Sequence, residues 1–295
     1  MIRNLRRQLL LAMLCSCTSF SAWAWGQEGH AVVAEIAQRR LSPAATAAVE
    51  HLLGRGHSLA AVASWADDMR EARPETYRWH FVSIPRAAPT YEAARDCAAT
   101  TRGDCVVAQL ERLKNDLRCA ATADLRRDAL RYAVHFVGDI HQPLHAVGDE
   151  RGGNLLMVRV EWRGLTCLAK CVPKRIDANF HAVWDSHLIN SVAWNWGAYV
   201  NRLEGGWLAG AEARAADADG GSAADWANAT HTQGQAVWDL VPPTRVLDDS
   251  YFQQVLPVVD RQLGLAGLRL ARFLNEAYET RACAARGSRG SSLSD

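Results

Sequence analysis

Apolar residues recur at helical spacing along almost the whole chain, and this pattern limits the possible folds more than any other feature. The helical windows are residues 29–41, 58–70, 106–119, 124–139, 180–191, 194–208, 222–240 and 251–283. Ser42 and Pro43 suit the N-cap and the first residue of a further helix. Only residues 155–162 alternate as a strand does, with Gly164 suited to a turn. We therefore expect an all-α fold, a single, mostly helical domain with a short β-hairpin.

The first 24 residues have the three parts of a signal peptide. Three arginines precede an apolar run that starts at Leu9, and residues 22–24 form a small-x-small cleavage motif. We expect cleavage between Ala24 and Trp25. The protein would then be secreted or periplasmic.

The sequence after the signal peptide reads as one domain, residues 25–285. Residues 209–221 are rich in Ala, Asp and Gly and suit an exposed connector between helices. Residues 286–295 are rich in Gly and Ser and should form a disordered tail. No apolar run in this part reaches about 18 residues, so we expect no membrane span.

Six cysteines follow the signal peptide, and an even number in an exported chain favours disulfides. Short spacing favours the pairs Cys97–Cys105 and Cys167–Cys171, which leaves Cys119–Cys283 to hold the C-terminal helix. A zinc site built from cysteines is the weaker alternative, because oxidised cysteines cannot bind a metal and no histidine is spaced among them.

The charge balance lacks the excess of basic residues that is common in nucleic-acid-binding proteins. Removing the three signal-peptide arginines from the 33 basic residues leaves 30, against 32 acidic residues, so the net charge is −2. Proteins that bind nucleic-acid backbones usually carry a basic stripe, and this sequence shows none. If the chain handles phosphates, something other than Lys and Arg must supply most of the positive charge.

His135 and Asp139 are the centre of a candidate metal site. They lie four residues apart in a helical window, so both side chains project from one face. Pro143 should break this helix and let His145 turn back toward that face. Imidazole and carboxylate groups at this spacing suit a zinc ion.

Further candidate ligands lie on both sides of this segment. His181 and Asp185 repeat the four-residue spacing, and Asp67 and His80 lie upstream. Cleavage of the signal peptide would add the α-amine of residue 25, a tryptophan, which titrates near ~8 and can give up its proton to a metal.

The amine and the carbonyl of Trp25 could then chelate a metal together, with His30 close behind in the sequence.

Taken alone, each of these candidate ligands has a simpler explanation: an exposed first residue, a hydrogen-bonded core histidine, or a salt bridge between residues four apart. Together, nine donors of suitable types favour a metal centre. Structural roles remain for His51, His57, His141, His187 and His231, and packing roles for Trp65, Trp79 and Trp184.

Five stretches of the sequence together resemble a known family. They are Trp25-Gly26 with His30, Trp65-Ala66-Asp67, Trp79-His80-Phe81, His135 to Asp139 with Gln142-Pro143-Leu144-His145, and Asn179-Phe180-His181 with Trp184-Asp185. The combination covers nearly the whole mature chain and is similar to secreted, zinc-dependent nucleases that prefer single strands, the S1/P1 nuclease family. The resemblance implies the mostly helical fold shared with zinc-dependent phospholipase C, with three zinc ions at the bottom of a cleft.

The resemblance also implies which residues hold each zinc ion. The first ion would be held by Asp67, His80, His135 and Asp139; the second by Trp25 and His30, with Asp139 bridging to the first; and the third by His145, His181 and Asp185. Three zinc ions against three carboxylates leave a net charge of about +3 to attract a phosphate. The metals would thus replace the missing basic stripe.

The reaction implied is hydrolysis of RNA and single-stranded DNA to 5′-mononucleotides, with removal of 3′-phosphates from nucleotides as a second activity. We expect a zinc-activated hydroxide to attack phosphorus in line while the third ion stabilises the leaving 3′-oxygen. Asp67 could also orient the attacking water, so no separate general base is needed. A recessed site would favour flexible single strands over duplexes. We expect a monomer with no stable protein partner.

Four further positions are expected to contact the substrate. Asn154 matches a family asparagine near the scissile phosphate, and Arg70 lies where members carry a basic residue. A turn residue and a solvated helix-end arginine are the structural alternatives for these two positions. Phe81 lies next to the candidate ligand His80, and Ser83 replaces an aspartate that contacts the base in better-known members. The base preference therefore does not carry over.

Two other functions remain open at this point. A zinc-dependent phospholipase C shares the fold, but its last ligand is typically glutamate rather than the aspartate found at position 185. A zinc-binding protein without catalytic activity would close its coordination shells, whereas nine donors shared by three ions leave positions open.

Overall fold

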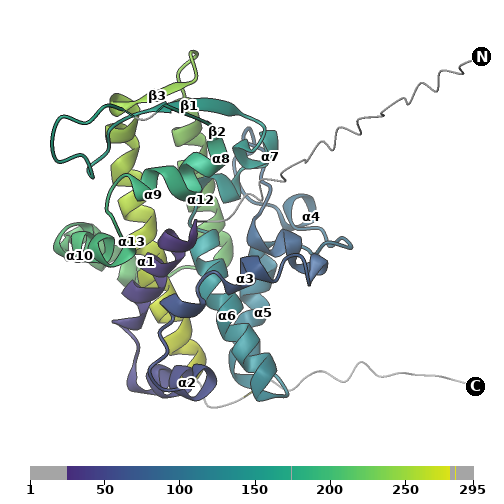
Figure 1. Ribbon diagram of the computed structural model, residues 1–295. Coiled ribbons are helices and arrows are strands. Elements are labelled where there is room, and N and C mark those ends of the chain that lie inside the picture. Colours follow the sequence, from purple (N-terminus) through teal and green to yellow (C-terminus); the bar gives the residue numbers. More distant parts are fainter. Residues whose placement is uncertain (1–24, 174, 280–282, 284–295) are drawn as a thin grey trace, which may run out of the picture.

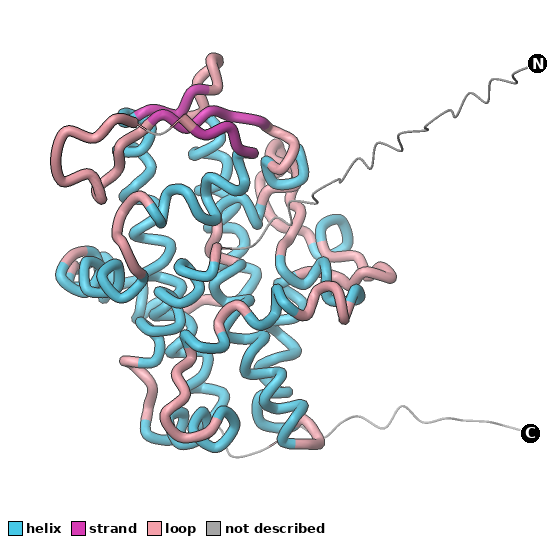
Figure 2. Tube along the Cα trace, in the orientation of Figure 1, coloured by secondary structure: helices cyan, strands magenta, loops and turns pink. Residues whose placement is uncertain are grey.

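The computed structural model describes residues 25–173, 175–279 and 283, so the predicted signal peptide and C-terminal tail lie outside the described residues. The described chain is mostly helical, as predicted, and a small sheet lies at one end (Figures 1 and 2). Its α-helices are α1 Gln27–Gln38, α2 Pro43–Leu53, α3 Trp65–Asp68, α4 Ala93–Asp96, α5 Val106–Cys119, α6 Ala123–Asp139, α7 Glu150–Gly153, α8 Phe180–Ala182, α9 Leu188–Asn190, α10 Trp196–Gly205, α11 Ala211–Asp219, α12 Ala223–Asp239 and α13 Asp249–Glu279. Four short 3₁₀ segments are η1 Ala60–Val62, η2 Pro74–His80, η3 Pro143–Ala146 and η5 Trp207–Ala209, and η4 Val183–His187 is a π-helical turn. The strands are β1 Met157–Glu161, β2 Ile176–Asn179 and β3 Val246–Asp248.

The long helix α13 lies at the centre of the core. It packs against α1, α2, α5 and α6, so helices from the two ends of the described chain lie side by side (Figure 1). Leu263, Leu270 and Leu274 of α13 are fully buried in this contact region. In the part of the chain that the structure describes, no helix combines the length and the apolar character needed to cross a membrane.

The sheet is larger than the hairpin that the sequence predicts. β1 pairs antiparallel with β2 and parallel with β3, in the order β2-β1-β3. Gly164 follows β1 with a φ of 69°, as a turn requires, but the connection to β2 is long and not a tight turn. β3 is only three residues long and comes from just before α13, so no local alternation could reveal it.

Polar N-caps fix where several helices begin. The Ser42 side chain accepts a hydrogen bond from the Ala45 N–H, with Pro43 as the first residue of α2, as predicted. Ser222 and Asp225 form a capping box at the start of α12. Helices α5 and α6 agree with their predicted windows to within one residue.

Two secondary-structure predictions are wrong. Residues 58–70 form the short segments η1 and α3 instead of one helix, because the carbonyl of Ala63 accepts a hydrogen bond from His135 Nδ1 (2.7 Å) rather than from the next turn. The predicted connector at 209–221 contains α11, whose alanines favour a helix and whose Ala213 is buried.

All three predicted disulfides are confirmed. Cys97 pairs with Cys105, and Cys167 pairs with Cys171, so each closes a short loop. Cys119 at the end of α5 pairs with Cys283 beyond α13, which links two helices of the core.

Candidate metal centre

Eight of the nine predicted ligands form three neighbouring groups. Within each group the candidate ligand atoms lie within 4.8 Å of one another. The groups are His30, His135 and Asp139; Asp67, His80 and His135; and His145, His181 and Asp185. They come from seven separate elements, so the tertiary structure brings together side chains that the sequence spreads over more than half its length.

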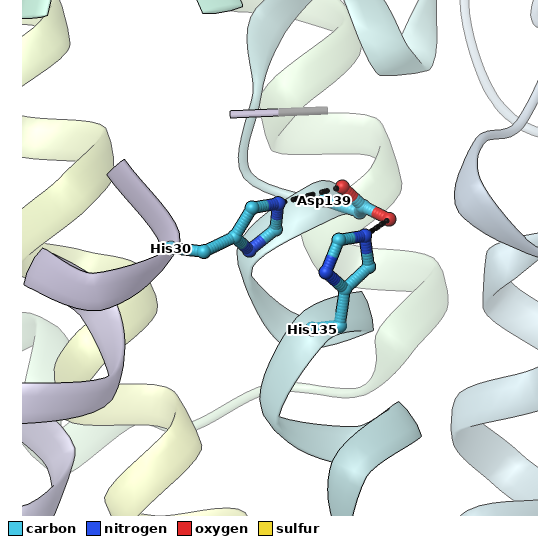
Figure 3. A group of neighbouring side chains, drawn as sticks. All are labelled: His30, His135 and Asp139. Atoms are coloured by element: carbon cyan, nitrogen blue, oxygen red, sulfur yellow. Dashed lines mark ion pairs between the residues drawn. The ribbon is translucent and has the colours of Figure 1, made fainter. Parts of the chain in front are cut away.

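Asp139 lies at the centre of the first group. Its Oδ1 atom lies 3.5 Å from His30 Nε2, and its Oδ2 atom lies 3.2 Å from His135 Nε2 (Figure 3). His135 and Asp139 are one turn apart on α6, as their spacing predicts, and the ring of His30 from α1 stacks on that of His135. The helices can approach because residue 138 is glycine: a Cβ atom there would lie 2.8 Å from His30 Nδ1.

Asp67 on α3 and His80 on η2 complete the second group. Asp67 Oδ1 lies 3.5 Å from His80 Nδ1 and 3.6 Å from His135 Nε2. His80 Nδ1 also lies 3.1 Å from Asp139 Oδ2. Asp139 therefore faces the residues of both the first and the second predicted zinc sites.

The third group lies on short turns beyond α6. This helix ends at Asp139, before Pro143, and η3 turns the chain so that His145 Nδ1 lies 3.6 Å from Asp139 Oδ1. The rings of His145 and His181 stack on each other. Asp185 Oδ1 lies 3.9 Å from His145 Nε2, and Asp185 Oδ2 lies 3.4 Å from His181 Nε2. The predicted return of His145 toward this helix face is confirmed.

Backbone carbonyl groups orient three of the imidazole rings. His135 Nδ1 lies 2.7 Å from the carbonyl oxygen of Ala63. His145 Nδ1 lies 2.7 Å from that of His80, and His181 Nδ1 lies 2.6 Å from that of Gly152. A carbonyl oxygen can only accept a hydrogen bond, so each Nδ1 donates. In the neutral imidazole each Nε2 then keeps a lone pair directed at the candidate centre, as metal-binding histidines require.

Burial and neighbouring charges shift the pKa values of these groups. Burial lowers the pKa of His135, but the carboxylates of Asp139 and Asp67 outweigh this effect and raise it to about 9. Burial lowers the pKa of His80 to about 4, and burial together with the nearby His145 imidazole lowers that of His181 to about 3. A bound cation would balance this concentration of buried carboxylates without requiring protons.

Several buried atoms that face these groups have no hydrogen-bond partner among the described residues. They are His30 Nε2, His145 Nε2, Asp139 Oδ1 and Asp185 Oδ2. Leaving such a polar atom unsatisfied costs about 1–3 kcal/mol, and more for a charged group. Because metal coordination would satisfy these atoms, the residues present fit a site for metal ions.

Trp25, the ninth predicted ligand, is fully buried just before α1. The N–H of Gly26 donates to the carbonyl oxygen of Asp185 (2.7 Å), which places this backbone beside the third group. A Cβ atom on Gly138 would lie within 4 Å of both Trp25 and His30, so the tryptophan side chain also borders the first group. Metal binding by the Trp25 amine and carbonyl stays a prediction.

A cavity of about 1150 Å³ opens onto these groups. Asp67, His80, His145 and His181 contribute to its wall. All four residues expected to contact the substrate also line it: Arg70, Phe81, Ser83 and Asn154. Asn154 Nδ2 donates to the carbonyl of Arg151 (2.8 Å), so it also has the structural role of a turn residue.

Two residues that hold the third group were not singled out from the sequence. Gln142 Nε2 donates to Asp185 Oδ1 (2.6 Å), and its own Oε1 accepts from the N–H of Leu144. Gly152, at a φ of 66°, presents its carbonyl to His181. The sequence signals were a polar residue beside Pro143 and a pair of adjacent glycines, both too short to interpret alone.

The histidines assigned structural roles lie outside the three groups. His141 Nε2 accepts a hydrogen bond from Arg269 of α13 (2.9 Å), and His231 lies between the carbonyl oxygens of Ala146 and Ala88. These two buried histidines therefore join elements of the core. His51 and His57 are exposed, and His187 is partly buried.

Comparison with known proteins identifies the family of this chain. Residues 25–279 match the family described as S1/P1 Nuclease. The chain belongs to the S1/P1 nuclease family. Among its relatives, Endonuclease 2 of Arabidopsis thaliana is 29% identical over 290 residues, covering 86% of this chain and 90% of the relative. Nuclease P1 of Penicillium citrinum is 27% identical over 285 residues, covering 86% of this chain and 98% of the relative. Nuclease S1 of Aspergillus oryzae is 29% identical over 178 residues, covering 58% of this chain and 56% of the relative.

This S1/P1 nuclease is therefore a hydrolase of phosphodiester bonds, as predicted. The three groups of histidine and aspartate are the residues of this S1/P1 nuclease that could hold its metal ions.

Proposed function

We propose that this S1/P1 nuclease is an endonuclease that hydrolyses RNA and single-stranded DNA to 5′-mononucleotides and also removes 3′-phosphates from nucleotides. The observation that most supports this proposal is the placement of three His/Asp groups side by side at a large cavity. Relatives that match along most of this chain bear the names endonuclease and nuclease. A cavity of about 1150 Å³ supports catalysis over metal storage, since it leaves room for a substrate.

We also propose that the metal ions are three zinc ions. Imidazole nitrogens and carboxylate oxygens are the donors that zinc prefers. Three neighbouring groups support three ions, and the unpaired buried atoms support occupation of the first and third groups. Elemental analysis of the mature, active protein should find about three zinc ions per chain. A metal content of one ion or none would contradict this assignment.

The chain's own residues would position the substrate and the attacking water. When bound, the ions would supply positive charge for the phosphate and bring the pKa of a water molecule toward about 7. The Asp67 side chain is only 5% exposed but borders the cavity, so its carboxylate can accept a hydrogen bond from that water. Arg70, whose Nη1 lies 3.4 Å from Asp67 Oδ1, can donate to a phosphate oxygen beside it.

Substrate bases would contact the part of the wall that carries Phe81 and Ser83. The Phe81 ring offers a stacking surface, and the Ser83 hydroxyl can exchange hydrogen bonds with a base edge. Because the ligand atoms are buried, a substrate must enter the cavity to reach them. A flexible single strand can do so, whereas a duplex is too wide and stiff. Comparable rates on native and denatured DNA of one sequence would contradict this preference.

The activity can be tested on RNA in a gel. The protein should clear RNA, lose this activity in a chelator and regain it with added zinc. A matched sample treated with chelator that was saturated with zinc beforehand should keep its activity. Failure to cleave RNA or denatured DNA by fully metal-loaded protein would overturn the proposed function.

We further propose that the signal peptide is removed and that the α-amine and the carbonyl of Trp25 hold the second ion together with His30. A variant that keeps one extra residue before Trp25 would carry an amide there instead of an amine. It should fold, bind about one zinc ion fewer and lose more than about 99% of its activity, since a metal ligand is missing. Full activity in that variant, with the extra residue verified by mass spectrometry, would refute this role.

We propose that the mature protein is exported and acts as a monomer. Three disulfides support export, since such bonds persist in oxidising compartments. Light scattering of the purified protein would measure the oligomeric state directly.

A further inference from the structure

Four arginines line the wall of the cavity, although the overall sequence has no basic stripe. They are Arg70, Arg78, Arg102 and Arg151. They come from the link after α3, from η2, from the loop before α5 and from α7, so only the fold brings them together. The proposed nuclease activity uses Arg70, but leaves the others without a role.

Tyr77 on η2 organises this cluster. The Arg102 guanidinium carbon lies 3.7 Å from the centre of the Tyr77 ring, and that of Arg70 lies 4.8 Å from it. Such cation–π contacts hold guanidinium groups in place. Burial raises the pKa of the Tyr77 hydroxyl, but the charge of Arg70, a hydrogen bond from Arg151 and the charge of Arg102 together outweigh burial and leave this pKa below its usual value. Tyr77 is thus surrounded by positive charge.

The loop that carries Arg102 is built rigidly. The disulfide between Cys97 and Cys105 closes it, and Thr100 pairs with Gly103 in an isolated β-bridge. The carbonyl of Arg102 accepts a hydrogen bond from the N–H of Arg78 (3.0 Å), which ties the loop to η2. Arg102 is therefore held at the cavity by contacts on both sides of it in the chain.

Arg151 lies in a strained part of α7. Glu150 and Arg151 have φ values of 45° and 55°, in the left-handed region that residues with a Cβ atom rarely adopt. The next residue, Gly152, presents its carbonyl to His181 of the third metal group. The same turn thus orients a candidate metal ligand and directs Arg151 into the cavity.

Arg102 and Arg151 lack acidic partners. Within residues 25–173, 175–279 and 283, no carboxylate lies within ion-pair distance of either guanidinium group, although Asp68 and Glu71 also line the cavity. By contrast, Arg163 pairs with Asp249 elsewhere on the surface. Two cations without counter-charges at the edge of a substrate cavity suit an anionic ligand.

We propose that Arg102 and Arg151, positioned by Tyr77, bind the phosphodiester group next to the scissile one in a single strand. This inference rests on the proposed function, because it requires a scissile phosphate near Asp67. Arg70 lies against both Asp67 and the Tyr77 ring, and Arg102 and Arg151 lie near the same tyrosine, so a phosphate bound by these two arginines would neighbour one bound by Arg70. A strand of several nucleotides would therefore bind more tightly than a dinucleotide with a single phosphate.

The test measures the coupling between the arginines and one flanking charge. Trinucleotides are prepared with two phosphodiesters, or with one of them replaced by a neutral methylphosphonate on the 5′ or the 3′ side. In the wild-type enzyme, one of the two replacements should lower kcat/KM at the remaining phosphodiester by about tenfold through a higher KM. In the double variant Arg102→Gln/Arg151→Gln, the same replacement should cost less than about twofold.

Salt dependence gives a second measurement. Each lost phosphate contact should reduce the slope of log(kcat/KM) against log salt by about 0.7 for a single strand. The control is Arg55→Gln, which removes one exposed positive charge outside the cavity and should keep the wild-type slope and the wild-type methylphosphonate penalty. Tyr77→Phe should keep the part of the coupling that depends on Arg102, because the ring remains, and lose the part that depends on the hydrogen bond to Arg151, whereas Tyr77→Ala should lose both.

The outcomes separate the subsite from the activity itself. If the wild-type enzyme cleaves the trinucleotides but the methylphosphonate penalty is the same in wild type and double variant, the subsite is wrong and the nuclease function stands. If metal-loaded wild type cleaves none of them, the proposed function fails first. The single variants, checked by circular dichroism and zinc content, provide the same comparison should the double variant not fold.

Discussion

One group of the candidate metal centre lies on two regular helices, whereas another lies on short irregular turns. His30, His135 and Asp139 project from α1 and α6, which pack in the core. The third group instead comes from the 3₁₀ turn η3, the three-residue helix α8 and the π-helical turn η4. Both groups use imidazole and carboxylate donors, and both are buried.

The difference shows two ways to hold the same donors. On α6 the helix itself places His135 and Asp139 on one face, and packing at Gly138 brings α1 against it. In the third group the backbone supplies little regular support, so two tertiary hydrogen bonds fix the side chains: Gln142 donates to Asp185, and the Gly152 carbonyl accepts from His181. The helix-held group should therefore be sensitive to packing, and the loop-held group to single hydrogen bonds.

The largest effect is expected from Asp139→Ala. Asp139 faces His30, His80, His135 and His145, so its removal takes a carboxylate from the helix-held group and from the link to the loop-held group. We expect kcat/KM to fall by more than about a thousandfold with loss of bound zinc. Asp217→Ala, at an exposed position on α11, should leave both unchanged. Wild-type zinc content in Asp139→Ala would contradict a ligand role.

Gly138→Ala tests the packing between α1 and α6. The new Cβ atom would lie 2.8 Å from His30 Nδ1, so the helices must separate at the cost of about 1–3 kcal/mol of unfolding free energy. The displaced His30 should lower kcat/KM by about a hundredfold. Gly205→Ala is the matched control, because nothing lies within 4 Å of its Cβ position, and it should stabilise α10 by about 0.5–1 kcal/mol. Thermal unfolding measures the change in stability of the two variants, and steady-state kinetics measure kcat/KM. Wild-type values of both in Gly138→Ala would contradict the close packing of α1 on α6.

Gln142→Leu tests the loop-held group. It removes the hydrogen bond to Asp185, and loss of a residue that orients a metal ligand typically costs 10–100-fold in metal affinity or activity. The effect should appear as weaker binding of one of the three proposed zinc ions in a chelator titration. Gln253→Leu, an exposed position on α13, should behave like wild type. Equal weakening of all three ions would show that the groups are not held independently.

The smallest effect on catalysis is expected from the double variant Cys119→Ser/Cys283→Ser. This disulfide spans 164 residues, so its loss should lower the free energy of unfolding by about 5 kcal/mol, while Cys167→Ser/Cys171→Ser should cost about 2. Neither pair belongs to the metal groups, so kcat/KM should stay within about twofold at a temperature where the variants are folded. A selective loss of one zinc ion would instead connect a disulfide to the centre.

Local patterns in the sequence were enough to predict the parts of the fold that depend on neighbouring residues. The helical windows of α5 and α6, the cap at Ser42 and the face shared by His135 and Asp139 all follow from backbone periodicity and nearby hydrogen bonds. The long-range pairing of Cys119 with Cys283 followed only because the other cysteines had close partners.

The tertiary structure decided everything that depends on a contact between distant segments. The break before α3, the strand β3 and the support of Asp185 by Gln142 each rest on a hydrogen bond or pairing to a remote residue. The gathering of Arg102 and Arg151 at Tyr77 has the same origin, since nothing in their local sequences marks them. Local geometry is set by the chain over a few residues, but the position of one segment against another is set only when the whole core packs.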